Sequence, residues 1–149
     1  EHFSKVRHFY NLMSAYIYVA GPLFNSHERW FVERIAAALE NAGYRTFVPH
    51  RDAGVLTEFK EENRTHIFRT DMEAIMRCDA CVALLTGADH DSGTCAEIGY
   101  LNAKGIPVFG ITDDIRWLNN FIWGMCNEGK YLVKTIDEVL PLLAERLKV

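Results

Sequence analysis

Five short runs of β-forming residues alternate with longer stretches of helical periodicity, and this alternation constrains the fold more than any other feature. The runs span residues 16–20, 44–48, 81–85, 108–111 and 131–133. Parallel strands require crossover connections, which helices usually supply. The alternation therefore predicts an α/β fold with a single doubly wound, five-stranded parallel sheet, flavodoxin-like strand order 2-1-3-4-5 and helices on both faces.

Apolar residues at helical spacing fill the gaps between these strands. They predict helices over residues 30–42, 67–76, 94–104 and 139–147, and a helical turn in the aromatic segment 117–123. On the second helix, Asp71 is expected to lie off the apolar side that contains Phe68 and Met76. Residues 50–62 are polar and irregular, which fits either a loop that covers a substrate or a plain solvated loop.

The ends of two helices carry recognisable signals. Asn25 or Ser26 can cap the first helix, and Gly43 can end it in a left-handed conformation. Thr135 and Glu138 have the spacing of a capping box, in which the two side chains bond each other's backbone N–H groups. These signals place the first and the last helix in the chain.

The chain has 149 residues, the size of one ordinary domain, and 49% of them are apolar, enough for a sizeable core. Residues 13–149 are expected to form that domain. Residues 1–12 precede Met13, which looks like a natural start, and are expected to be a leader or an N-terminal arm. The net charge of −4 argues against a nucleic-acid partner, because a protein that binds nucleic acid needs a basic face. No apolar run has the length of a membrane span, so no membrane association is expected.

Cysteine spacing and glycine-rich motifs bear on cofactors. Cys78 and Cys81 form a CxxC pair, but no second ligand pair for zinc follows at a suitable spacing, and Cys81 lies in a predicted strand. We interpret both as core thiols, and reduced cysteines fit a cytoplasmic protein. Asp89, His90 and Asp91 lack further ligands, so no metal site is expected. The GxGxxG and GxxxxGK[ST] motifs are absent, and no cofactor is predicted.

The segment 91–100, DSGTCAEIGY, follows the third predicted strand and opens a helix. Ligands of open α/β sheets bind at the carboxyl ends of the strands. Thr94 and Glu97 fit a capping box, which would place Glu97 in the first helical turn. Alternatively, the helix N-terminus favours an ionised Glu97 that attacks an electrophilic sugar carbon. Asp91 is either the helix cap or an acceptor for a substrate hydroxyl group.

Other residues near the strand ends also allow either a structural or a ligand-binding interpretation. Tyr18 is either a core residue or a phenol that donates to a carboxylate across the crevice. Phe24 either stacks on a planar ring or covers the core. Gly21 and Gly93 leave room for a ligand to approach the backbone. Arg51, which follows the second strand, is a candidate for contacts with that ligand.

Four segments, in this order, resemble the nucleoside 2-deoxyribosyltransferase family, whose superfamily includes 2'-deoxynucleoside 5'-phosphate N-hydrolases. They are YVAGPLF at 18–24, TDM at 70–72, DSGTCAEIGY at 91–100 and NNFIWG at 119–124. The resemblance implies an enzyme of nucleoside salvage that transfers a deoxyribosyl group between bases, with retention and without a metal or cofactor. Its partners would be a 2'-deoxynucleoside, a free purine or pyrimidine base, and further copies of itself in a homo-oligomer with shared active sites.

The resemblance also implies roles for single residues. Glu97 matches the nucleophile that forms a covalent deoxyribosyl intermediate, Tyr18 orients it, and Asp71 helps to protonate the leaving base. Asp91 matches the residue that holds the 5'-hydroxyl. Asn119 matches an asparagine that reaches the 5'-hydroxyl in a neighbouring subunit's site.

One position helps to choose a substrate. The phosphate-using hydrolases have a serine six residues before the catalytic Glu, where this chain has Asp91, and a carboxylate repels a phosphate. This favours an unphosphorylated nucleoside, although Ser92 beside it leaves a phosphate contact open. Asp52 and Arg51 are candidates for contacts with the base. Two alternatives to transfer remain: hydrolysis of 2'-deoxynucleosides or their 5'-monophosphates, and a non-catalytic nucleotide-sensing module.

Overall fold

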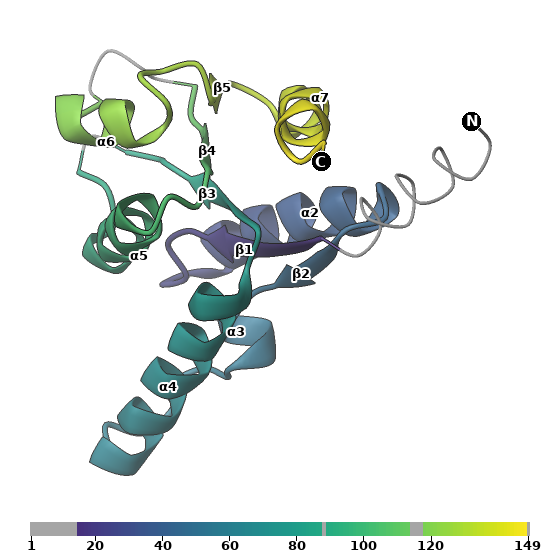
Figure 1. The fold of residues 1–149 in the computed structure, drawn as a ribbon. Coiled ribbons are helices and arrows are strands. Elements are labelled where there is room, and N and C mark those ends of the chain that lie inside the picture. Colours follow the sequence, from purple (N-terminus) through teal and green to yellow (C-terminus); the bar gives the residue numbers. More distant parts are fainter. Residues whose placement is uncertain (1–14, 88, 114–117, 149) are drawn as a thin grey trace.

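A computed structural model describes residues 15–148, except 88 and 114–117 (Figure 1). Its centre is a five-stranded sheet in the order β2-β1-β3-β4-β5, with every neighbouring pair parallel. The strands are β1 (Tyr16–Ala20), β2 (Arg45–Phe47), β3 (Ala80–Leu84), β4 (Val108–Ile111) and β5 (Leu132–Val133). The predicted fold class and strand order are confirmed. The expected leader or arm, residues 1–12, lies outside the described residues.

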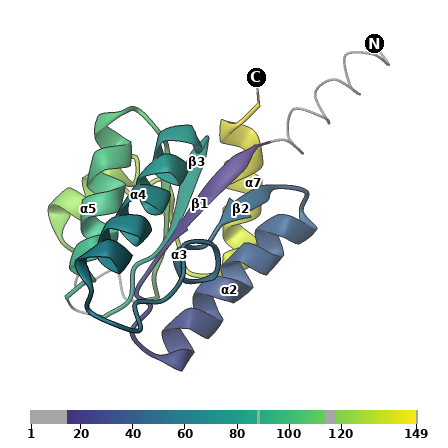
Figure 2. The ribbon, with the colours of Figure 1, turned by 90° about the horizontal axis from the view of Figure 1, so that it is seen from below.

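Two helices, α2 (Ser26–Asn41) and α7 (Ile136–Arg146), cover one face of the sheet (Figure 2). Strand side chains point alternately to the two faces, so Ile17 and Val19 of β1 face these helices. Helix α2 begins with a capping box in which Asn25 and Glu28 bond each other's backbone N–H groups. Gly43 follows the helix with a φ of 96°, as predicted. The capping box at Thr135 is also present.

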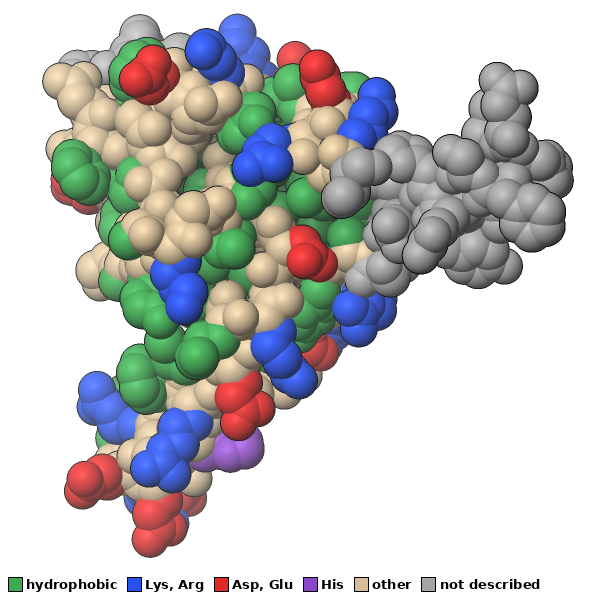
Figure 3. All heavy atoms as spheres, in the orientation of Figure 1, with side chains coloured by type: hydrophobic (Ala, Val, Ile, Leu, Met, Phe, Trp, Pro, Cys, Tyr) green, Lys and Arg blue, Asp and Glu red, His purple; other side chains and the backbone are tan. Residues whose placement is uncertain are grey.

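The opposite face packs against α4 (Glu61–Arg77), α5 (Ser92–Ala103) and α6 (Asn120–Met125). Tyr18 and Ala20 of β1 point to this side. Charged side chains of both signs are interspersed over the surface seen in Figure 3. No helix among the described residues is both long and apolar enough to cross a membrane.

The segment after β2 differs from its prediction. The expected irregular loop over residues 50–62 contains the short helix α3 (Pro49–Asp52), and α4 already begins at Glu61. Pro49 can start a helix because its missing N–H has no intrahelical partner there. The polar start of α4 has few apolar residues, so periodicity alone could not detect it.

The predicted apolar side of α4 is correct for Ile67 and Ile75, which pack in the core, and wrong for two other residues. Phe68 and Met76 are 65% and 62% exposed, whereas Asp71 is half-buried. Ile75 and Ala74 make the main core contacts of this helix. Asp71 therefore lies on the side that faces the sheet and not off it.

The cysteines of the structure are free, and Cys78, Cys81 and Cys126 are buried. Burial raises the pKa of the Cys78 thiol to about 11, so the neutral thiol is favoured. Cys81 is fully buried in β3. The interpretation of the CxxC pair as core thiols is confirmed.

Candidate active site

A tyrosine–glutamate pair joins β1 to α5. The side chain of Tyr18 is fully buried, and its ring stacks on Phe47 with centroids 5.5 Å apart. Its hydroxyl donates a hydrogen bond of 2.9 Å to Oε1 of Glu97. Burial and the neighbouring Glu97 both raise the pKa of Tyr18, which keeps the phenol protonated and able to donate.

Helix α5 begins at Ser92, earlier than predicted, and this changes the position of Glu97. Asp91 is the N-cap, and its Oδ2 accepts hydrogen bonds from the backbone N and Oγ1 of Thr94, both at 2.7 Å. Thr94 is therefore the third helical residue, and Glu97 lies in the second turn. The predicted capping box between Thr94 and Glu97 is wrong, and the carboxylate of Glu97 is not used as a cap.

The charge state of Glu97 is set mainly by burial. Burial raises its pKa to about 7, the hydrogen bond from Tyr18 lowers it, and the charges of Asp71 and Asp91 raise it. The expectation that the helix N-terminus keeps this group ionised is therefore not met near neutral pH. A carboxyl group with a pKa near 7 can exchange a proton or act as a nucleophile under ordinary conditions.

Asp71 provides a second perturbed carboxyl group. It lies on α4, and burial raises its pKa to about 6. Its Oδ1 is buried without a hydrogen-bond partner among the described residues. A buried oxygen without a partner is uncommon in folded proteins, so Asp71 retains an unused hydrogen-bond acceptor.

One cavity of about 510 Å³ brings these groups together. Glu97, Asp71 and Asp91 lie along it with Gly21 and Gly93, and Tyr18 lies behind Glu97. Phe24 also lines it and is 79% exposed. The volume is typical of small-molecule sites.

Gly21 and Gly93 are required for different structural reasons. A Cβ on Gly21, the residue after β1, would lie 2.8 Å from Cγ2 of Val32 and 3.1 Å from Cβ of Leu84, so the close approach of α2 and β3 requires a glycine here. A Cβ on Gly93 would lie 3.3 Å from Oδ2 of Asp91. The absence of a Cβ on Gly93 therefore gives Oδ2 of Asp91 the space to cap the helix. The other oxygen of Asp91, Oδ1, makes no bond to Thr94.

Other predicted site residues do not line this cavity. Asp52 accepts a bond of 2.7 Å from the backbone N of Val48 and pairs with Arg51, which also binds Glu40. Ser92 is exposed at the start of α5. Asn119 caps α6 and lies along a different cavity, between α5 and α6.

Several residues that sequence reasoning did not select do line the cavity. Arg29 reaches it from α2, where its Nη1 donates to the carbonyl oxygen of Leu23 at 2.8 Å. His50 reaches it from α3. The available signal for His50 was its position shortly after the second strand, since the carboxyl ends of parallel strands share one edge of the sheet. The apolar wall is formed by Leu23, Pro49, Val55, Leu56, Phe59 and Ile67.

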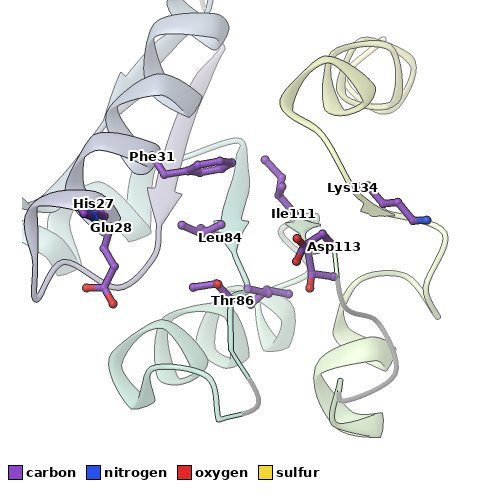
Figure 4. A pocket seen from close by; sticks show the side chains of 10 residues that line it. His27, Glu28, Phe31, Leu84, Thr86, Ile111, Asp113 and Lys134 are labelled. Atoms are coloured by element: carbon purple, nitrogen blue, oxygen red, sulfur yellow. The ribbon is translucent and has the colours of Figure 1, made fainter.

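A second cavity, of about 320 Å³, opens at the same edge of the sheet but on its other face (Figure 4). Phe31 of α2, Leu84 and Ile111 form its apolar part, and Asp113 and Lys134 lie at its margin. Glu97 and Asp71, the carboxyl groups whose pKa is raised, do not line this second cavity. Among the described residues, no group of three or more His, Cys, Asp or Glu side chains could hold a metal ion.

The fold and the first cavity define a doubly wound α/β protein with a cluster of carboxyl groups at the carboxyl ends of its strands. Most enzymes that cleave glycosidic bonds use a pair of carboxyl groups. The sequence profile described as nucleoside 2-deoxyribosyltransferase matches residues 17–136. The chain belongs to this family, whose enzymes act on the N-glycosidic bonds of nucleosides.

Solved structures agree with this assignment. A conserved protein from Enterococcus faecalis V583 is 26% identical, covers 89% of this chain and 99% of its own, and has a TM-score of 0.70. A 2-deoxyribosyltransferase from Bacillus psychrosaccharolyticus is 27% identical, covers 84% and 90%, and has a TM-score of 0.71. The CMP N-glycosidase BcmB from Clostridium botulinum is 19% identical, covers 88% and 98%, and shares the fold with a TM-score of 0.59. Comparison with curated protein sequences finds no match.

Proposed function

We propose that this protein transfers a 2-deoxyribosyl group between nucleobases in nucleoside salvage, through a covalent intermediate on Glu97 and with overall retention. The observation that carries the proposal is the hydrogen bond of 2.9 Å from Tyr18 to Oε1 of Glu97. It holds the carboxylate in one orientation beside the cavity and leaves the second oxygen, Oε2, to act on a substrate.

In the first step, Oε2 of Glu97 attacks the anomeric carbon, C1', and the bond from C1' to the base nitrogen breaks. Both electrons of that bond go to the base, which takes a proton from Asp71. The raised pKa of Asp71, about 6, supports this role because a fraction of the group is protonated near neutral pH. The lack of a 2'-hydroxyl lowers the cost of positive charge on the sugar ring.

In the second step, a ring nitrogen of the acceptor base attacks C1' and the ester bond to Glu97 breaks. The proton of the attacking nitrogen returns to Asp71, and Glu97 is released as a carboxylate. Two displacements at one carbon restore the original configuration. Water as the acceptor would give hydrolysis by the same route, so the balance depends on which acceptor enters the cavity.

Asp91 is proposed to hold the 5'-hydroxyl of the sugar. Its Oδ2 is fixed by two hydrogen bonds from Thr94, which leaves Oδ1 to accept from a substrate hydroxyl. We also propose a homo-oligomer in which Asn119 of one copy reaches the site of another. Phe121 and Trp123, beside Asn119, are 76% and 42% exposed, which supports contact with a second copy.

One assay tests transfer. Deoxyinosine and free adenine are incubated with the protein, and nucleosides and bases are separated over time. Appearance of deoxyadenosine is expected. Loss of deoxyinosine to hypoxanthine and free deoxyribose, with no deoxyadenosine, would refute transfer and leave hydrolysis.

A specific observation favours a second candidate, hydrolysis of a 2'-deoxynucleoside 5'-monophosphate. Arg29 lines the same cavity and brings a guanidinium group that could bind a phosphate. Its bond to the carbonyl of Leu23 occupies Nη1 only. A kcat/KM at least about tenfold higher for deoxyinosine 5'-monophosphate than for deoxyinosine, lost in Arg29→Gln, would support this candidate. Equal or lower values for the monophosphate would refute it.

A further inference from the structure

His50 lines the cavity, and one of its two ring nitrogens has no hydrogen-bond partner. Its side chain is 9% exposed, and its Nδ1 is buried without a hydrogen-bond partner. Three buried side-chain atoms in the described part of the chain lack partners, and two of them belong to the cavity residues His50 and Asp71. Buried polar atoms are nearly always bonded, so these two point to a ligand with polar groups.

The other ring nitrogen of His50 is fixed from outside the cavity. Nε2 lies 2.6 Å from Oε1 of Glu33, which is on α2 and whose side chain is 55% exposed. An ionised carboxylate only accepts hydrogen bonds, so Nε2 must carry the proton. In the neutral ring, Nδ1 then presents a lone pair, and the ligand group that meets it must be a donor.

We infer that His50, held in this tautomer by Glu33, selects purine bases that carry an exocyclic amino group next to N7. The inference deepens the proposed function and rests on it. A protonated Asp71 donates a hydrogen bond and Nδ1 of His50 accepts one, so a matching base edge offers an acceptor beside a donor. On the edge that includes N7, adenine offers N7 as an acceptor beside its amino group, whereas hypoxanthine offers two acceptors, N7 and O6.

The apolar wall agrees with a planar ligand at this place. Pro49 precedes His50, and Val55, Leu56 and Phe59 follow it in the cavity lining. A ring placed against these residues would be excluded from water on its faces, while its edge would meet polar atoms. In such a site an unmatched donor or acceptor is costly, because water cannot replace the missing partner.

Consumption of donor nucleosides tests the inference. The value of kcat/KM is measured for deoxyadenosine against deoxyinosine, with one common acceptor base. Intrinsic differences between leaving groups cancel when the ratio of a variant is compared with that of the wild type. His50→Phe is expected to lower the value for deoxyadenosine by about tenfold or more and to change that for deoxyinosine much less.

Glu33→Lys is the sharper variant because it acts only through His50. A lysine ammonium donates and cannot accept, so Nε2 would have to accept and Nδ1 would carry the proton. The preference is then expected to shift toward deoxyinosine, which a merely structural role of Glu33 would not produce. Glu73→Lys, an exposed residue of α4 outside this cavity, is the charge-matched control and should leave the ratio unchanged.

A ratio that is the same in the wild type, His50→Phe and Glu33→Lys would overturn the inference, as would a wild-type preference for deoxyinosine that depends on His50. Binding of free adenine and hypoxanthine, measured by calorimetry, separates this outcome from failure of the proposed function. Tighter binding of adenine that His50→Phe abolishes, in a protein that consumes no nucleoside, would uphold the base selection and refute the transferase activity. Melting curves establish that each variant is folded.

Discussion

Two glutamates near helix N-termini show how differently one residue type is used at one edge of the sheet. Glu28, on α2, accepts hydrogen bonds from the backbone N atoms of Phe24 and Asn25 and completes a capping box. Glu97, on α5, lies one turn further into its helix and accepts from Tyr18 instead. Glu28 lines the second cavity and Glu97 the first. A carboxylate used by backbone N–H groups stabilises a helix, whereas one buried against a phenol is free for chemistry.

The two cavities differ for the same reason. Both open at the carboxyl ends of the strands, where a ligand site is expected. The cavity on the α4 and α5 face buries two carboxyl groups enough to raise their pKa, to about 7 for Glu97 and about 6 for Asp71. Position at the sheet edge therefore defines where a site can be, and burial of titratable groups decides which cavity can react.

The largest expected effect is a loss of activity that occurs on substitution of Glu97 but not of Glu28. Glu97→Gln should lower kcat for nucleoside consumption by about 10³-fold or more, because an amide cannot serve as the nucleophile. Glu28→Ala should leave kcat nearly unchanged and lower the free energy of unfolding by about 1 kcal/mol, the usual cost of a lost cap. Steady-state kinetics and urea unfolding measure the two. Equal activity losses in both variants would remove the distinction.

The next effect concerns Asp71. The reaction requires an ionised Glu97 and a protonated Asp71. Ionisation of Glu97, with a pKa of about 7, increases activity as the pH rises, whereas loss of the proton from Asp71, with a pKa of about 6, decreases it. The resulting profile of kcat/KM is bell-shaped with its maximum between these values, which belong to the pair as a whole.

Asp71→Asn should lower kcat/KM by about 10²- to 10⁴-fold and remove the fall at high pH. It should also move the low-pH limb to lower pH, because the charge of Asp71 raises the pKa of Glu97. The pH dependence of kcat/KM for the wild type and the variant is the measurement. A variant that kept the fall at high pH would show that another group supplies the proton.

A third prediction concerns stability. The pKa of Glu97 is raised from 4.5 to about 7 in the folded protein, so the folded state binds the proton more tightly. This favourable contribution is complete below pH 4.5 and is lost as the pH rises to about 7. Glu97→Gln should therefore stabilise the protein by up to about 3 kcal/mol above pH 7 relative to its effect at pH 4. Urea unfolding at both pH values measures it, and an equal effect at the two would contradict the burial of an ionisable group.

The smallest effect is expected for Tyr18→Phe. Loss of the hydrogen bond should raise the pKa of Glu97 further, because that bond lowers it at present. The low-pH limb should move to higher pH, and activity at pH 6 should fall by about tenfold, while activity well above pH 7 falls less. Phe47→Leu, which removes the ring stacked on Tyr18 but keeps the hydroxyl, is the control. An unchanged low-pH limb in Tyr18→Phe would show that the bond does not tune Glu97.

Much of the architecture was predictable because it depends on local patterns. Short β-forming runs that alternate with helices allow few arrangements, and the strand order was expected from them. A cap at Asn25 or Ser26 and a capping box at Thr135 were expected from residue types and spacing. Predictions failed where local patterns compete. Two overlapping cap signals, Asp91 and Thr94, lie at the start of α5, and the structure uses Asp91. On α4, Ile67 and Ile75 were correctly predicted to face the core, but Phe68 and Met76 are exposed.

The sequence by itself determined the layers of this protein, the order of its strands and the edge at which a site can form, since these follow from residue spacing and chain connectivity. Only the tertiary structure decided what that edge can do. Tyr18 and Glu97 are 79 positions apart, and His50 and Glu33 are 17 apart. Their contacts, and the burial that raises the pKa of Glu97, exist only after the sheet brings separate segments together, because charge state and hydrogen bonding depend on neighbours in space.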